Sequence, residues 1–146
     1  MARPIKVRKV EGLPKQNYFI PVGKKKCEIQ EIELKVEELE AMRLKDIMGL
    51  SQEECAEQME VSRQTFQNIL EDARKKLTLA LVEGNAIRIE GGNFVDKACQ
   101  YYCNHCGTTY KVQYKIDQEK CPTCGATEIT CGKKECSCMK DCRRWK

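Results

Sequence analysis

Apolar residues recur every three or four positions along a stretch in the middle of the chain. The members of this pattern are Phe66, Ile69, Leu70, Ala73, Leu77, Ala80 and Leu81. The spacing is that of an α-helix with one buried face. Ser62 precedes the pattern as a candidate N-cap, and Gly84 follows it as a residue that can adopt a left-handed backbone and end the helix. We therefore predict a helix over residues 63–83.

A shorter helix is predicted directly upstream of the first. Ser51 and Glu54 have the spacing of a capping box, and Leu50 and Cys55 can form the hydrophobic staple around it. Another apolar stripe, within residues 36–47, predicts a third helix. Three helices of this size can enclose one small core, so the predicted fold class is mainly α.

The two adjoining helices have the plan of a helix-turn-helix, whose second helix lies in the major groove of DNA. Arginine can pair with guanine edges, and glutamine and asparagine with adenine edges. Thr65 faces partly inward and suits a phosphate or turn contact, whereas Arg74 and Lys75 lie further along and are placed to meet phosphate. A three-helix bundle that binds no DNA is the alternative explanation of the same pattern.

Three segments resemble region four of sigma factors, the part that reads promoter DNA. They are ELEAMRLKD, GLSQEECAEQM and VSRQTFQNILEDARKKL, at residues 38–46, 49–59 and 61–77. This resemblance implies base or adjacent phosphate contacts by Arg63, Gln64, Gln67 and Asn68.

The chain is still more similar to a family of small, uncharacterised prokaryotic proteins predicted to bind DNA. The shared features are the opening MARP, a Phe-x-Pro-x-Gly segment at residues 19–23, the helix-turn-helix, and an IRIEGG-like segment at residues 87–92. The resemblance covers residues 1–92. The sequence departs from it at Glu60, where relatives tend to have Gly, and at Cys55, where they tend to have Ala.

Charge is segregated along the chain, whose formal net charge is +4. Residues 1–26 carry +7, residues 27–92 carry −7 and residues 93–146 carry +4. Attraction to phosphate would then depend on a basic N-terminal arm, residues 1–27, which has no helical period. We expect the arm to be extended and to follow the DNA backbone or enter the minor groove, with a solvated tail as the alternative. Its candidate DNA contacts are Arg3, Lys6, Arg8 and Lys9, with Lys15 and the run Lys24–Lys26.

Two CxxCG sequences begin a second predicted domain. Their four cysteines are Cys103, Cys106, Cys121 and Cys124, and 14 residues separate the pairs. Two such knuckles present four thiolates to one ion, which is typical of a structural zinc ribbon with a closed coordination shell. Apolar and polar residues alternate over residues 110–116 and predict a half-buried strand between the knuckles. The segment also resembles the rubredoxin-like end of rubrerythrins, so iron is the alternative to zinc.

A cysteine-rich tail follows. Its cysteines are Cys131, Cys136, Cys138 and Cys142. They could bind a second zinc ion or an iron–sulfur cluster, act as redox-sensing thiols, or remain free. The predicted organisation is a basic N-terminal arm (1–27), a helix-turn-helix domain (28–92), a small β zinc-ribbon-like metal domain (97–128) and the tail (129–146).

Several classes of protein are disfavoured. No apolar run reaches the roughly 18 residues of a membrane span, and the basic N-terminus lacks the apolar segment of a secretory signal. Eleven cysteines without an export signal favour metal ligation in the cytoplasm over disulfides. No phosphate loop, activated nucleophile or open metal site is present, so we expect no catalysis.

Two functional hypotheses follow from these patterns. The first is a transcription regulator that binds specific double-stranded DNA sequences, with RNA polymerase as a candidate partner of the ribbon. The second is a metal-binding or redox protein, similar to rubredoxin, in which the helices serve assembly only. Apolar residues near the end of the long helix could form a homodimer seam or pack on the ribbon. They are Leu77, Leu79, Leu81 and Val82.

Overall fold

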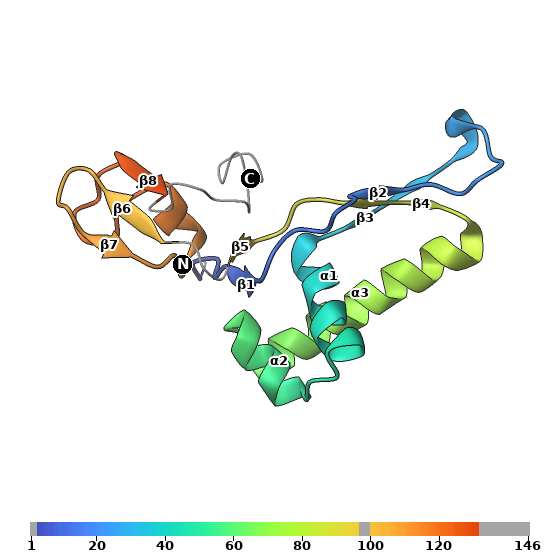
Figure 1. The fold of residues 1–146 in the computed structure, drawn as a ribbon, viewed down its shortest axis with the longest axis horizontal. Helices are drawn as coiled ribbons and strands as arrows, with labels where there is room; N and C mark the ends of the chain where they lie inside the picture. Colours follow the sequence, from blue (N-terminus) through green and yellow to red (C-terminus); the bar gives the residue numbers. More distant parts are fainter. Residues whose placement is uncertain (1–2, 97–99, 132–146) are drawn as a thin grey trace. The chain divides into compact units, whose positions relative to one another are not determined.

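The computed structural model describes residues 3–96 and 100–131, which form two compact units (Figure 1). We call residues 13–92 the helical unit. Residues 3–12, 93–96 and 100–131 form the cysteine unit. In the described part of the chain, no helix is both long enough and apolar enough to span a membrane.

Two helices of the helical unit have the boundaries that their caps predict. Helix α2 (Gln52–Met59) begins after Ser51, whose Oγ accepts a hydrogen bond from the Glu54 amide at 3.2 Å, while the Glu54 carboxylate accepts from the Ser51 amide at 3.0 Å. Helix α3 (Arg63–Glu83) begins after Ser62 and ends at Gly84, which has a φ of 68°. Both predicted helices are confirmed.

The upstream helix is less regular than its apolar stripe predicts. Helix α1 (Val36–Met42) continues directly into a π-helical segment, η2 (Arg43–Ile47). The wider π turn rotates the residues that follow it away from the α-helical period. As a result Leu44 is buried, whereas Ile47 is 78% exposed. A single regular helix over residues 36–47 is therefore wrong.

A three-stranded sheet accompanies the helices and was not predicted. Strand β4 (Ala86–Ile89) lies between β2 (Tyr18–Phe19), which is antiparallel to it, and β3 (Glu31–Leu34), which is parallel to it. A short 3₁₀ turn, η1 (Lys26–Glu28), lies between β2 and β3. Arg88 donates to both carboxylate oxygens of Glu31, at 3.0 and 3.1 Å, and Tyr18 donates to the same carboxylate at 2.8 Å.

The fold class predicted from sequence is wrong in its main point. The described residues contain three α-helices and eight strands in three small sheets, so the protein is not mainly α. Each strand is only two to four residues long. Such strands are too short to show the alternation of apolar and polar residues from which a strand is predicted.

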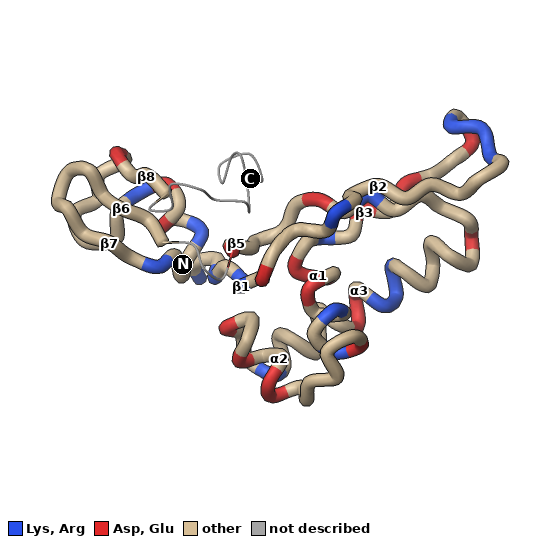
Figure 2. Tube along the Cα trace, viewed as in Figure 1, with Lys and Arg blue, Asp and Glu red and all other residues tan. Residues whose placement is uncertain are grey.

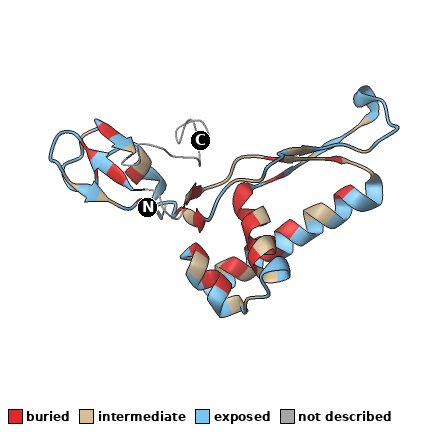
Figure 3. Ribbon diagram, in the orientation of Figure 1, coloured by how far each residue is buried: buried red, intermediate tan, exposed pale blue. Residues whose placement is uncertain are grey.

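The core of the helical unit lies where its three helices meet (Figure 3). Phe66, Met59 and Leu70 are its largest fully buried side chains. Two carboxylates of α1 are also buried and have cationic partners. Glu38 lies 2.7 Å from the Lys76 ammonium, and Glu40 lies 2.5 Å from the Arg43 guanidinium. These pairs attach α1 to α3 and to η2.

The turn between α2 and α3 contains a strained residue, Glu60, with φ 54° and ψ 45°. Among the described residues it is the one non-glycine with a positive φ. We expect Glu60→Gly to raise the free energy of unfolding by about 0.5 to 1 kcal/mol, because glycine adopts this conformation without a Cβ clash. Urea titration measures the change. Glu60→Ala is the matched control and should bring no gain; a loss of stability on Glu60→Gly would contradict the prediction.

The cysteine unit is built from short strands. Its central strand β6 (Tyr101–Cys103) lies between β7 (Thr109–Tyr110) and β8 (Ile129–Cys131), both antiparallel to it. A separate pair is formed by β1 (Arg8–Val10) and β5 (Phe94–Asp96), which run parallel. A 3₁₀ segment, η3 (Lys115–Gln118), follows β7. The core residues of this unit are Val7, Val95, Tyr101, Cys103, Val112, Cys121 and Ile129.

The first residues of the chain do not form a separate basic arm. The Val7 amide donates to the Gln113 carbonyl at 3.0 Å, and the Lys115 amide donates to the Ile5 carbonyl at 2.8 Å. Val7 is buried in the core of the cysteine unit. Residues 13–27 belong to the helical unit instead. The single arm predicted over residues 1–27 is thus divided between the two units.

Candidate metal centre and the exposed face of helix α3

The two CxxCG sequences fold into two equivalent turns. The Gly107 amide donates to the Cys103 carbonyl and the Gly125 amide to the Cys121 carbonyl, each at 2.9 Å. Both glycines have a left-handed backbone, with φ of 75° and 76°. Glycine adopts this conformation without the cost that a side chain imposes. The local sequence therefore determines how each pair of thiols is presented.

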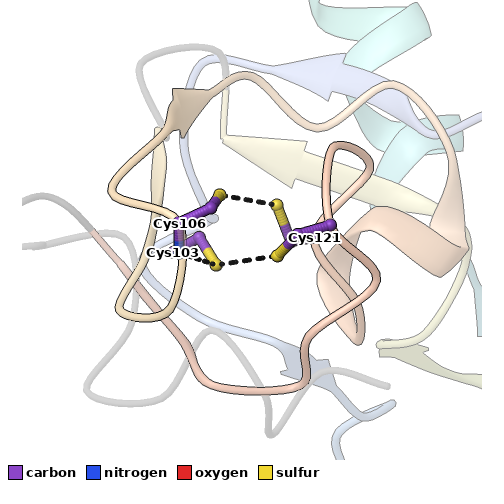
Figure 4. Close-up of side chains that lie close together, drawn as sticks. Cys103, Cys106 and Cys121 are labelled. Atoms are coloured by element: carbon purple, nitrogen blue, oxygen red, sulfur yellow. Dashed lines mark hydrogen bonds between the residues drawn. The ribbon is translucent and has the colours of Figure 1, made fainter.

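The four sulfur atoms come together in one cluster (Figure 4). Cys103 Sγ lies 3.6 Å from Cys124 Sγ, Cys106 Sγ lies 3.7 Å from Cys121 Sγ, and all four atoms lie within 4.8 Å of one another. A tetrahedral zinc site with Zn–S distances of about 2.3 Å places its sulfurs about 3.8 Å apart. The donors and their spacing fit such an ion, so these cysteines could hold a metal.

The thiols of the cluster differ in acidity because they face different groups. Contacts with the hydroxyl and amide of Thr108 lower the pKa of Cys106 to about 6. Although the Ala126 amide lowers the pKa of Cys124, burial and the neighbouring thiols raise it to about 12. Negative charge on one sulfur thus disfavours ionisation of the next. A metal ion removes this conflict, and its binding displaces protons.

The continuous strand predicted between the knuckles is wrong: β7 ends at Tyr110, and Tyr114 forms an isolated antiparallel bridge with Lys6. The Asp117 carboxylate accepts hydrogen bonds from the amides of Gln113 and Tyr114 at 3.1 and 3.0 Å, and these bonds turn the chain. Ile116 is consequently 56% exposed. Asp117 is the sequence feature that argues against a continuous strand here. An aspartate side chain can bind nearby backbone amides and so compete with strand pairing.

The predicted second metal or redox site lies mostly outside the described residues. Cys131 is half-buried in β8, where it is paired with Tyr101. Cys136, Cys138 and Cys142 fall in residues 132–146, outside the described part of the chain.

The start of α3 presents polar side chains to solvent. Arg63, Gln64 and Asn68 are exposed. The Arg63 guanidinium lies 3.3 Å from the Glu53 carboxylate, and its Nε donates to the Gln52 side chain at 3.2 Å. Gln64 donates to Asn68 at 3.0 Å. The structure therefore brings three of the predicted DNA-contact residues onto one exposed stretch of helix.

The other candidates on α3 take part in local contacts. Thr65 and Gln67 are half-exposed; the Thr65 hydroxyl accepts from Ser62 at 2.8 Å, and Gln67 donates to Glu71 at 2.9 Å. Arg74 lies 2.5 Å from the Asp46 carboxylate. Lys75 is exposed.

Among the predicted contacts of the N-terminal residues, that of Lys9 needs correction. Lys9 is 6% exposed and donates to the Val112 carbonyl, so its ammonium is not available to a phosphate. Arg8 is half-buried and donates to the Lys6 carbonyl at 3.0 Å. Arg3 and Lys6 are exposed. The prediction failed for Lys9 because its position is set by contact with a residue more than a hundred positions away.

A second basic group is attached to the far end of α3. The stretch Lys24–Lys26 lies between β2 and β3, at the tip of the sheet of the helical unit (Figure 2). Lys24 Nζ lies 3.2 Å from the Gly84 carbonyl, next to the C-terminus of the helix. A helix of 21 residues is about 31 Å long. These lysines are therefore about one helix length from Arg63 and do not extend its surface.

Fold and sulfur cluster together define a class of protein: a three-helix unit with a small sheet, joined to a four-cysteine unit that has the donors of a metal site. Residues 1–97 match the family described as "Protein of unknown function DUF134", and the chain belongs to this family. The predicted membership in a family of small uncharacterised proteins is thereby confirmed.

Relatives of similar length support the assignment. A UPF0251 protein of Clostridium novyi is 56% identical over 144 residues, which are 99% of this chain and 98% of the relative. A UPF0251 protein of Clostridium tetani is 57% identical over 145 residues, 99% of this chain and 96% of the relative. One from Clostridium acetobutylicum is 57% identical over 143 residues, 98% of this chain and 100% of the relative. No solved structure matches the chain.

Proposed function

We propose that this protein binds specific sequences of double-stranded DNA and regulates transcription. In this proposal α2, the turn at residues 60–62 and α3 act as a helix-turn-helix, and the first turns of α3 enter the major groove. The observation that carries the proposal is the exposed polar surface at the capped start of α3. Arg63, Gln64 and Asn68 combine the side-chain types that pair with guanine and adenine edges.

The contacts that these side chains make within the protein are weak enough to be replaced by contacts with DNA. Arg63 and Glu53 have side chains that are 66% and 64% exposed, and an ion pair this exposed contributes little to stability. Arg63 can therefore leave Glu53 for a guanine or a phosphate at small cost. The hydrogen bond between Gln64 and Asn68 holds both amides on one side of the helix before binding. We also assign Gln67 to the residues that contact DNA in the major groove.

The four cysteines have a structural role in this proposal. Four thiolates complete a tetrahedral shell and leave no position for a substrate, so we assign zinc as a stabilising ion and propose no catalysis. The thiolate set requires a reducing compartment, which the cytoplasm provides. RNA polymerase is the partner that we propose for the cysteine unit, on the basis of the resemblance of the helices to a sigma-factor region.

Selection of DNA from the source genome tests the proposal. Metal-loaded full-length protein is incubated with fragmented genomic DNA at about 0.15 M salt, where non-specific attraction is screened, and bound fragments are sequenced. We expect enrichment of a shared motif. Uniform or absent recovery would overturn the proposal and favour the metal-binding or redox hypothesis, in which the helices serve assembly only.

A further inference from the structure

The second half of α3 contains many exposed residues (Figure 3), and some of them are large and apolar. Leu79 is 45% exposed and Val82 is 79% exposed. Single exposed apolar residues are ordinary on a protein surface, but several together mark an interaction site. On α3, Leu79 and Val82 lie three positions apart and share one face of the helix. Leu81 is 73% exposed but lies two positions from Leu79 and faces another side, so it is not part of this face.

Two residues of opposite charge flank Leu79 at the same spacing along the helix. Lys75 precedes Leu79 by four positions and Glu83 follows it by four, so all three lie along the same side of α3. Lys75 forms no ion pair with any of residues 3–96 and 100–131. The Glu83 carboxylate accepts a hydrogen bond from Asn85 at 3.4 Å. We call Lys75, Leu79, Val82 and Glu83 the α3 seam.

We propose that the α3 seam is the contact between two copies of this chain. When two α3 helices pack antiparallel about a two-fold axis at Leu79, Lys75 lies opposite the partner's Glu83, and Glu83 lies opposite the partner's Lys75. Both ion pairs form at once because an isologous contact uses the same patch twice. This self-complementary order of charges about an apolar centre selects a second copy over an unrelated partner.

Further apolar side chains lie near the same end of the helix. Phe19 is 53% exposed, Ile20 is 54% exposed and Val22 is fully exposed, at and beyond β2. Lys24, two residues past Val22, lies 3.2 Å from the Gly84 carbonyl, so this stretch reaches the last turn of α3. A stable dimer buries at least about 1,200 Å² in total. The exposed apolar residues at this end of the sheet add to the surface that the two helices can bury between them.

The seam and the proposed DNA surface occupy different parts of α3. In the antiparallel arrangement, position 74 lies opposite the partner's Gly84, where the partner's helix ends. Residues 63–73 therefore extend past the segment in which the two helices pair, and Arg63, at the opposite end of α3 from Gly84, takes no part in that helix pairing. The pairing itself requires no DNA, so the two proposals can fail independently.

Sedimentation equilibrium of the metal-loaded full-length protein without DNA tests the pairing. We expect a mass twice that of one chain at micromolar concentration, and conversion to monomer by Leu79→Glu. Lys75→Glu places like charges opposite each other twice and should weaken dimerisation about tenfold, as should Glu83→Lys. The double variant Lys75→Glu with Glu83→Lys restores both pairs and should return the dissociation constant to within about threefold of the original.

Ile116→Glu, at a 56% exposed apolar residue of the cysteine unit, is the control and should leave the dimer intact. Circular dichroism verifies that each variant keeps its helices. A monomer at all concentrations would overturn the proposal, as would a dimer that tolerates Leu79→Glu. Failure of the double variant to restore the affinity lost in Lys75→Glu would also overturn it.

Discussion

Replacing Cys121 by serine should abolish metal binding and unfold the cysteine unit. Cys121 is buried in the core of that unit and is also one of the four sulfur donors. Seven residues make up this core, and a core so small needs additional stabilisation. Structural zinc provides about 10 to 16 kcal/mol in small zinc-dependent folds, which exceeds the whole stability of most units of this size. The variant therefore loses more free energy than the folded cysteine unit has in total, and the unit unfolds.

Metal analysis and tryptic digestion measure these effects. We expect about one metal ion per chain in the original protein, less than a tenth of that in Cys121→Ser, and cleavage confined to the cysteine unit. Chelation of the original protein should reproduce the same cleavage. Cys27→Ser is the control, because Cys27 is exposed and lies in the helical unit. Full metal content and unchanged protease resistance in Cys121→Ser would show that the four sulfurs do not hold a structural ion.

Arg63→Ala should lower the affinity for specific DNA about 10- to 100-fold while leaving the fold intact. An arginine that pairs with guanine through two hydrogen bonds contributes about 1 to 3 kcal/mol of discrimination against the wrong base. The side chain is 66% exposed, and its contacts within the protein are a surface ion pair and one hydrogen bond to Gln52. Removal thus costs little stability, so a loss of binding reports the contact with DNA.

Fluorescence anisotropy with a selected DNA site and a scrambled one separates base reading from general attraction. Arg63→Ala should weaken the specific site more than the scrambled site. Lys111→Ala removes the same charge from an exposed position in the cysteine unit and should weaken both equally or not at all. Equal losses in Arg63→Ala and Lys111→Ala would mean that Arg63 contributes charge alone, and unchanged binding in Arg63→Ala would exclude α3 as the reading helix.

The features that could be predicted from sequence are those determined by residues close together in the chain. The starts of α2 and α3 follow from serine caps three residues from their amide donors. The two knuckles follow from a five-residue pattern that ends in glycine. In each case the physical cause lies within one turn of backbone. The cysteines of the candidate metal centre were therefore identified correctly as a group.

The features that could not be predicted depend on distant partners. Strand β1 exists because β5 pairs with it, and Lys9 is buried because Val112 provides its acceptor. Nothing in residues 3–12 alone distinguishes this strand from a solvated basic tail. The buried Glu38 likewise reads as a surface acid until Lys76 is known to lie 2.7 Å away.

The position of β1 has a consequence for how the protein is made. Val7 belongs to a core whose other members begin at Val95, so the helical unit is synthesised between the two parts of the cysteine unit. Ribosomes add about 5 to 20 residues per second, so the first strand waits roughly 5 to 20 seconds for its partners. During that interval the helical unit can fold by itself. The metal site is completed only after the second knuckle, residues 121–125, has emerged, and a fusion ahead of β1 would place its bulk next to a strand that still has to dock.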